Sequence, residues 1–401
     1  MAADEDYIQL RDNNGDDEKR INRRIASIDV FRGLSVSLMI FVDYAGSLLP
    51  FIGHSPWNGV HLADCVMPFF LLIVGLSLAI SYKKVDDKVH ATRKAVTRAI
   101  QLFLLGVFLQ GGYFHGITSL TFGVDIESIR WLGILQKRRW SISLCFCLLC
   151  RCTALALCII YSGLLYGVYV SDWQFEVPDP TSSMSSPSYT SVVYTVKCGV
   201  RGDLGPACNS AGLIDRYVLG LNHLYKKPVY KNLKECSSPE DGLYTESQPP
   251  WCQAPFDPEG ILSSLTAAVT CIIGLHYGHV LVQFEDHKSR LLHWSLFSVL
   301  LFVLGVVLTY AGIPLNKSLY TVNYMLLTSA ISGATFCALY VLVDVYGCRR
   351  LTFVLEWMGV HSLAVFVLVT SNLAVILIQG FYWKSPKNNI IIWIITRVVR
   401  K

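Results

Sequence analysis

The sequence has few charged residues for its length. Asp, Glu, Lys and Arg make up 16% of the 401 residues, against about a quarter in soluble domains. Hydrophobic residues make up 53%, and the formal net charge is +5. This composition excludes a disordered chain and an ordinary soluble domain. With so small an excess of positive charge we also expect no nucleic-acid partner.

The chain also lacks internal repeats and the apolar core of a secretory signal peptide, because residues 1–24 are polar. We therefore expect the first apolar run to serve as a membrane anchor. Most of the apolar runs are close to the ~18–20 residues that cross a bilayer as a helix. They lie near 33–52, 63–82, 99–117, 141–170, 261–284, 291–312, 321–345 and 352–380. The predicted fold is all-α: a polytopic helical bundle, surrounded by membrane lipid, with a cysteine-containing lumenal loop.

Basic residues are distributed unevenly around the first two runs. Five of them lie between Lys19 and Arg32, just before the first run, whereas residues 53–62 contain no Lys or Arg. Because cytosolic segments are enriched in Lys and Arg, we expect a cytosolic N-terminus and a lumenal segment 53–62. The same reasoning divides the chain into a cytosolic tail (1–27), an N-terminal bundle (28–170), a lumenal loop (171–260) and a C-terminal bundle (261–401).

The predicted lumenal loop contains four cysteines: Cys198, Cys208, Cys236 and Cys252. An even number of cysteines in an oxidising compartment favours two disulfides. The alternative is four free thiols in a cytosolic loop. Spacing alone does not give the pairing.

Residues 131–170 do not fit the pattern of crossings. Both flanking connections are predicted to be lumenal, which requires two crossings, yet this segment is short for two helices and contains Lys137, Arg138, Arg139 and Arg151. It therefore forms a distorted hairpin, or the chain lacks sequence that this architecture expects. The last apolar run, from Ile390 to Ile395, is also too short to span.

Polar groups at membrane depth are costly and are usually functional. Asp29 and Arg32 stand three residues apart at the cytosolic end of the first run, so they can pair on one helix face. The alternative is a pair that merely anchors the helix at the membrane interface.

A second group of polar residues gathers at the lumenal end of the same run. Asp43 lies within the run, His54 and His61 follow it, and Asp64 opens the next run. A neutral imidazole can act as a general base or a nucleophile, and a carboxylate can orient it. A metal bound by His54, His61 and Asp64 is an alternative, although their spacing matches no zinc signature. A second alternative is a capped helix–loop–helix at the membrane interface whose polar residues have only a structural role.

Three blocks of sequence resemble the transmembrane acetyltransferases typified by heparan-alpha-glucosaminide N-acetyltransferase. The first contains Arg24-x4-Asp29-x-x-Arg32-Gly33, then Phe41-Val-Asp43-Tyr, and His54-Ser-Pro-Trp57-Asn58-Gly59 followed by Ala63-Asp64 and Pro68-Phe69. The second contains GLIDRYVLGLNHLY (212–225) and Phe256-Asp-Pro-Glu-Gly260-Ile-Leu. The third is Pro314-Leu-Asn316-Lys317-Ser-Leu.

The resemblance implies an enzyme that moves acetyl from cytosolic acetyl-CoA to a lumenal amino sugar, such as a terminal glucosamine, without a metal. It implies that His54 is catalytic and that the chain resides in a lysosomal or vacuolar membrane, with a homodimer as a possible assembly. Asp29, Arg32, Trp57, Asn58 and Asp64 are then expected to contact donor or acceptor.

Asp43 departs from this family, whose lysosomal enzyme has Asn at the matching position. Asn donates a hydrogen bond and an ionised Asp does not, so we expect Asp43 to act instead by orienting His54 and raising its basicity. His361, within the last long run, is a second-rank candidate for which core packing is the simpler explanation. A transporter, or a catalytically inactive or variant-spliced relative, is the alternative to the enzyme.

Overall fold

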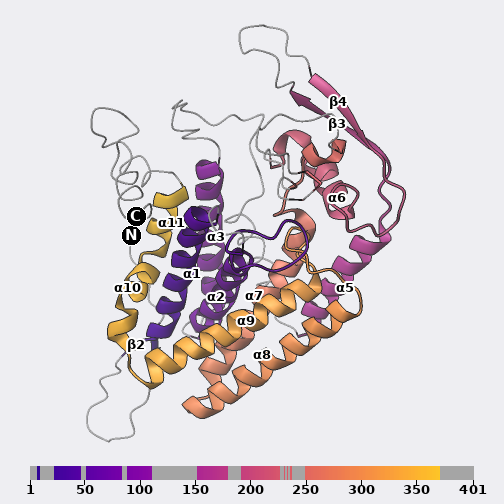
Figure 1. The fold of residues 1–401 in the computed structure, drawn as a ribbon. Helices are drawn as coiled ribbons and strands as arrows, with labels where there is room; N and C mark the ends of the chain where they lie inside the picture. Colours follow the sequence, from indigo (N-terminus) through magenta and orange to yellow (C-terminus); the bar gives the residue numbers. More distant parts are fainter. Residues whose placement is uncertain are drawn as a thin grey trace, which may run out of the picture.

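The computed structural model describes residues 7–9, 22–46, 51–83, 88–110, 151–178, 191–225, 230, 233, 235–236 and 249–370. These residues form a bundle of helices with a small loop region at one end (Figure 1). Within the described part, four helices are long and apolar enough to cross a membrane, and a bent helix pair raises this to as many as five. The prediction of a helical membrane protein is confirmed.

The bundle is formed by nine described helices and one π-helical turn. They are α1 (Ala26–Ala45), α2 (Leu62–Lys83), α3 (Lys88–Gln110), α5 (Arg151–Gly167), α7 (Ile261–Gln283), α8 (His287–Tyr310), α9 (Val322–Tyr340) with the turn η5 (Val341–Val345), α10 (Arg349–Val360) and α11 (Ser362–Thr370). A short antiparallel ribbon, β1 (Tyr7–Gln9) with β2 (Asn22–Arg24), precedes α1.

Helix α1 begins and ends seven residues earlier than the apolar run 33–52 that predicted it. Its first turns carry Asp29 and Arg32, whose side chains form an ion pair at 2.8 Å. Asp29, an acid in the first turn, interacts favourably with the positive end of the helix dipole, which favours a helix start just before it. The last residue before the C-cap Gly46 is Ala45.

The centre of the bundle is the contact between α2 and α7. A Cβ at Gly274 would lie 2.2 Å from the Leu72 carbonyl oxygen, and one at Gly75 would lie 2.0 Å from the Cys271 carbonyl oxygen. Only glycine lets the two backbones approach so closely, as is common where helices pack in membranes. In the most apolar stretch of α2, 78% of the residues are buried, against 22% in that of α8. Helix α2 is therefore central and α8 peripheral.

The order of the contacts shows which ends of the helices lie together. Leu72 of α2 faces Gly274 of α7 and Leu76 faces Gly278, so these two helices run in parallel. Tyr324, at the start of α9, bonds to Asp64, at the start of α2. Residues 51–61, 249–260 and 311–321 therefore lie at one end of the bundle, which we call the His54 end, as the predicted crossings require.

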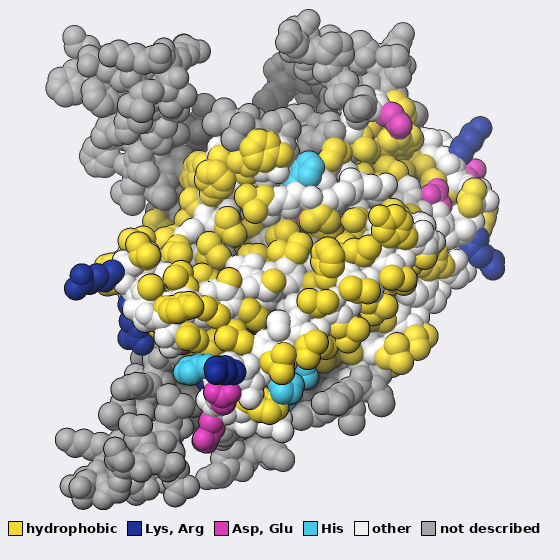
Figure 2. Space-filling view, turned by 60° about the horizontal axis from the view of Figure 1, so that its bottom comes forward, with side chains coloured by type: hydrophobic (Ala, Val, Ile, Leu, Met, Phe, Trp, Pro, Cys, Tyr) yellow, Lys and Arg dark blue, Asp and Glu magenta, His cyan; other side chains and the backbone are white. Residues whose placement is uncertain are grey.

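One face of the molecule is a broad hydrophobic surface with its charged side chains near the edge (Figure 2). Exposed apolar side chains of α8 contribute to it, and they are Leu292, Leu296, Val299, Leu300, Phe302, Val303, Leu304 and Val307. A helix that exposes so many large apolar side chains needs lipid or protein around it, which agrees with an integral membrane protein.

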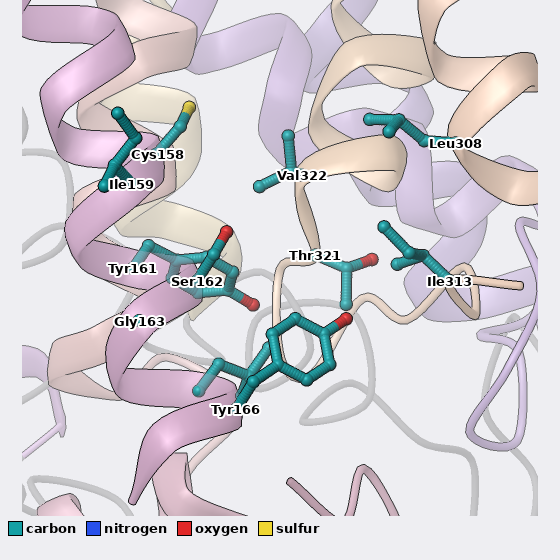
Figure 3. A pocket seen from close by; sticks show the side chains of 11 residues that line it. Cys158, Ile159, Tyr161, Ser162, Gly163, Tyr166, Leu308, Ile313, Thr321 and Val322 are labelled. Atoms are coloured by element: carbon teal, nitrogen blue, oxygen red, sulfur yellow. The ribbon is translucent and has the colours of Figure 1, made fainter. Parts of the chain in front are cut away.

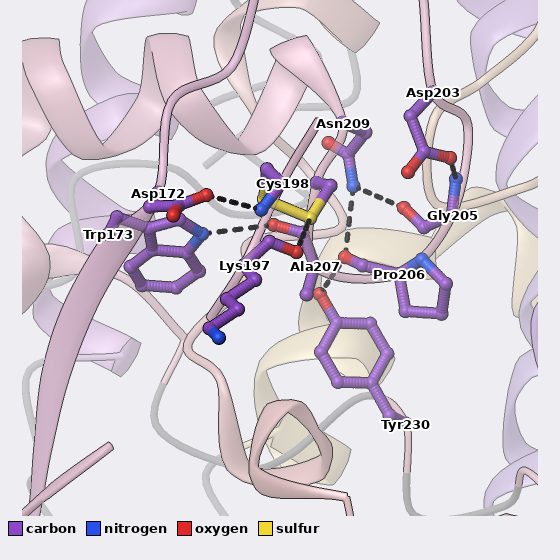
Figure 4. Close-up of a disulfide and its surroundings, with 11 residues drawn as sticks. Asp172, Trp173, Lys197, Cys198, Asp203, Gly205, Pro206, Ala207, Asn209 and Tyr230 are labelled. Carbon is purple, nitrogen blue, oxygen red and sulfur yellow. Dashed lines mark hydrogen bonds between the residues drawn. A yellow bond between two sulfur atoms is a disulfide. The ribbon is translucent and has the colours of Figure 1, made fainter. Parts of the chain in front are cut away.

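The loop region contains a hairpin, β3 (Trp173–Pro178) with β4 (Ser191–Val196), then α6 (Ser210–Leu219), η2 (Leu221–His223) and η4 (Pro250–Gln253). Disulfides join Cys198 to Cys208 and Cys236 to Cys252, which confirms the prediction of two and supplies the pairing. Asp172 accepts a hydrogen bond from the Cys198 amide at 2.7 Å, so the hairpin and the first disulfide are held together (Figure 4).

The first half of the segment 131–170 lies outside the described residues, as does the chain after residue 370. The described part of the segment, from 151, begins with α5, one apolar helix that leads directly to the loop region. The predicted hairpin at 131–170 thus stays a prediction, as does the division into four parts.

Replacing Gly274 with Ala should destabilise the protein by about 1–3 kcal/mol, because the added methyl group forces α2 and α7 apart. Thermal unfolding in detergent measures this. Gly163 on α5 is the matched control, since an added Cβ there meets no atom within 4 Å. Gly163→Ala should leave stability unchanged or raise it slightly. Equal melting temperatures for the two variants would contradict the role of the α2–α7 contact.

Candidate active site

Asp64 is at the centre of the polar residues at the His54 end. It is the third residue of α2, and its Oδ2 accepts hydrogen bonds from the backbone amides of His61 at 2.9 Å and Ser55 at 3.2 Å. An acid at this helix position commonly bonds back to the amide of the capping residue. The side chain is completely buried, and its oxygens organise the 54–61 loop around the start of the helix.

Two further side chains share the other carboxylate oxygen. Asp64 Oδ1 lies 3.0 Å from His54 Nδ1 and 3.2 Å from Lys317 Nζ. Lys317 Nζ is also 2.7 Å from His54 Nδ1. The three groups form a compact triangle that joins α2 to the connection between α8 and α9.

His54 combines a buried contact with an accessible ring. Its side chain is 54% exposed, although Nδ1 faces the completely buried carboxylate. Since Nδ1 is engaged, Nε2 is the nitrogen on the open side of the ring. This arrangement is typical of a general base or nucleophile whose orientation is set by a carboxylate.

The Lys317 amine is largely removed from solvent, which disfavours its charged form. Burial lowers the pKa of Lys317 from its usual value, and the neighbouring Asp64 carboxylate opposes that shift. Glu259, in the connection that leads into α7, also interacts with it electrostatically. Lys317 is thus held by carboxylates from two separate segments.

The structure gives the orienting contact to Asp64 and not to Asp43. Asp43 is exposed near the end of α1 and interacts with His54 and Lys317 through charge, with no hydrogen bond to either shown. The contact predicted for Asp43 is thus made by Asp64 instead, and the catalytic role of either carboxylate stays a prediction. Asp64 takes this position because the first turn of α2 follows the 54–61 loop directly.

The segment that carries Lys317 is held against the 54–61 loop. Asn316 is fully buried, and its Nδ2 donates to Asn58 Oδ1 at 3.3 Å. Asn316 Oδ1 accepts from the Leu319 amide at 2.8 Å, and the Gly59 amide donates to the Leu315 carbonyl at 2.8 Å. Asn58 was expected to contact a substrate. In the structure it connects the 54–61 loop, which carries His54, to the α8–α9 connection, which carries Lys317.

Trp57 is also built into the protein rather than presented at its surface. Its indole is 5% exposed, its Nε1 donates to the Leu204 carbonyl at 3.0 Å, and its ring packs edge-on against Tyr230 and Phe256. Tyr230 in turn donates to the Pro206 carbonyl (Figure 4). Trp57 thus anchors the 54–61 loop to the disulfide-bonded region.

The remaining predicted site residues lie away from His54. Asp29 and Arg32 pair near the opposite end of α1, and Arg32 also donates to Ser77 of α2 at 3.3 Å. His361 is exposed, at the 67° bend between α10 and α11, so its assignment to core packing was wrong. Its ring lies beside Trp357.

Lys317 is the site residue that sequence reasoning missed. It stands within the Pro314-Leu-Asn316-Lys317 block used for the resemblance, but that block was assigned no chemistry. A lysine in a short connection is usually a solvated charge, and only the fold brings this one to Asp64. The match of this block to an enzyme family was the available signal.

A separate pocket of about 450 Å³ lies between α5 and the facing ends of α8 and α9 (Figure 3). Its lining includes Tyr161, Ser162, Tyr166 and Thr321 but no carboxylate, imidazole or amine. The His54 cluster is therefore the better candidate for acid–base chemistry. In the described part of the chain, no group of three or more His, Cys, Asp or Glu side chains is arranged to hold a metal ion.

Comparison with known proteins bears directly on this site. Residues 24–194, which include His54 and Asp64, match the family described as heparan-alpha-glucosaminide N-acetyltransferase, catalytic. The resemblance to this family is confirmed. Over 380 residues, 86% of the chain, it is 28% identical to heparan-alpha-glucosaminide N-acetyltransferase of Mus musculus and covers 53% of that protein. The Homo sapiens protein of that name is 27% identical over 383 residues, which make up 86% of this chain and cover 52% of the human protein. The chain thus spans about half the length of these relatives.

Replacing the two carboxylates separately tests which one serves His54. If His54 carries acetyl transfer, Asp64→Asn should lower its rate at least about tenfold, because the ring loses the anion that orients it. Asp43→Asn, which leaves that hydrogen bond in place, should stay within about threefold of the unaltered protein. Transfer is measured in membranes at equal protein content. The opposite order of effects would return the orienting role to Asp43.

Proposed function

We propose that this chain is a membrane acetyltransferase that moves acetyl from acetyl-CoA on the cytosolic side to the amine of a sugar, such as a terminal glucosamine, on the lumenal side. The observation that carries the proposal is the half-exposed imidazole of His54, whose Nδ1 faces a buried carboxylate. The similarity to heparan-alpha-glucosaminide N-acetyltransferases over most of the chain supports the same chemistry.

Two routes use the open Nε2 of His54. In the first, Nε2 takes a proton from the neutral acceptor amine as its nitrogen attacks the thioester carbonyl, the carbon–sulfur bond breaks, and CoA leaves as its thiolate. In the second, Nε2 itself attacks the carbonyl, CoA leaves, and the acetyl group passes from the ring to the amine. Asp64 stabilises the positive ring formed in either route. Sequential kinetics support the first route and ping-pong kinetics the second.

The donor side of the proposal concerns the opposite end of the bundle. The phosphates of CoA are anions, and basic residues such as Arg32 and those of the 83–98 segment are suited to attract them. In this proposal the thioester reaches through the bundle from that end towards His54. This direction of transfer places the N-terminus in the cytosol and the disulfides in the lumen, which fits a lysosomal or vacuolar membrane. A homodimer remains part of the proposal.

Replacing His54 with Ala should lower acetyl transfer by at least about 10²-fold, because it removes the group that exchanges protons or acetyl. Binding of acetyl-CoA should persist, since its contacts are proposed at the other end of the bundle. Labelled acetyl-CoA and a glucosamine acceptor, supplied to membranes, give both measurements.

His293 is the matched control, an exposed histidine at the start of α8 whose Nδ1 faces the Ser289 carbonyl. His293→Ala should transfer acetyl at the normal rate. Normal turnover in His54→Ala would overturn the assignment of His54. Solute flux that needs no acetyl-CoA, together with no acetyl transfer by the unaltered chain, would favour a transporter instead.

A further inference from the structure

The contacts at His54 Nδ1 cannot all be hydrogen bonds at once. This nitrogen either carries a proton and donates, or presents a lone pair and accepts. Asp64 Oδ1, at 3.0 Å, only accepts when ionised, and a charged Lys317 Nζ, at 2.7 Å, only donates. A neutral ring therefore satisfies one of these neighbours and not the other. The carboxylate satisfies Lys317 in both cases, because Nζ also lies 3.2 Å from Oδ1.

The two arrangements differ in what they offer a substrate. When Nδ1–H donates to Asp64, Nε2 has a free lone pair on the open side of the ring and can act as base or nucleophile. When Lys317 donates to Nδ1, the proton of the neutral ring sits on Nε2, which then only donates. The balance between Lys317 and Asp64 thus controls whether His54 is ready to react.

We propose that Lys317 is a positioning residue for His54: by sharing Asp64 with the ring, it governs which nitrogen carries the proton, and its charge disfavours a second proton. This inference rests on the proposed function, since it assigns a role in the same reaction. Lys317 acts through the imidazole and touches neither donor nor acceptor in this scheme.

The surroundings of the ring support this role through their charges. The ionisable groups that interact with His54 or Lys317 come from α1, α2 and the connection into α7, and they are Asp43, Asp64, Cys65 and Glu259. The carboxylates among them all favour a doubly protonated His54, whereas Lys317 opposes it. Asn316 and the paired backbone of Gly59 and Leu315 fix the lysine at this distance.

Removing the charge of Lys317 should therefore change the protonation of His54 in a definite direction. With Lys317→Met or Lys317→Gln, the carboxylates are left without their cation, so the ring binds its second proton more readily. The midpoint of the His54 titration should move to higher pH by about one unit. Because transfer uses the neutral ring, the acidic limb of the pH–rate profile should move in the same direction. Lys317→Arg keeps the charge and should keep the unaltered midpoint, while Asp64→Asn should move it to lower pH.

The experiment uses the full chain in detergent, labelled with ¹⁵N-histidine. Ring nitrogen shifts are followed from pH 5 to 9, and the His54 signals are assigned by their loss in His54→Gln. The shifts also report which ring nitrogen is protonated. Thermal unfolding identifies variants that do not fold. If one of the two neutral variants fails to fold, the other is used in its place.

A higher midpoint in either folded neutral variant, with the unaltered midpoint in Lys317→Arg, supports the proposal. An unchanged midpoint and tautomer in a folded neutral variant overturns it, as does a shift in Lys317→Arg equal to that in the neutral variants. The titration needs no substrate. If the unaltered chain transfers no acetyl, the proposed function fails while the titration still decides the role of Lys317.

Discussion

The buried carboxylate of Asp64 is the constraint on which the His54 end of this protein depends. An ionised carboxylate without partners is strongly disfavoured in a buried environment. Here it accepts from two backbone amides and lies against an imidazole and an amine. Satisfying this one charge brings together α2, the 54–61 loop and the α8–α9 connection. The same contacts that stabilise the charge leave one side of the His54 ring open.

The rest of the bundle holds these segments in place. The backbones of α2 and α7 meet through Gly75 and Gly274, which brings the connection before α7 close to the start of α2. The loop region is fastened from the other side, since Trp57 is inserted among its aromatic side chains and bonds to Leu204. Disulfides within that region stiffen the surface against which Trp57 packs. A site made of short loops is thereby supported by rigid neighbours on both sides.

The motif that contains His54 also contains residues whose contacts are structural. Trp57 and Asn58 belong to the motif that contains His54, yet one is buried in the loop region and the other bonds to Asn316. Their side chains keep the loops together. The side chains of His54 and Lys317, in contrast, remain partly exposed.

Three features could be predicted from the sequence alone: the helical membrane fold, the two disulfides, and a cluster of imidazoles and carboxylates around the end of the first apolar run. These follow from local properties: the length of apolar runs, the parity of crossings and the spacing of polar residues. Through a motif the sequence also pointed to His54 as a candidate. The fold alone shows that Asp64, rather than Asp43, lies against the ring, that Lys317 joins them, and that Trp57 is buried. Those outcomes depend on how α2, α9 and the loop region meet, and contacts between residues more than 250 positions apart have no signature in the local pattern of a single sequence.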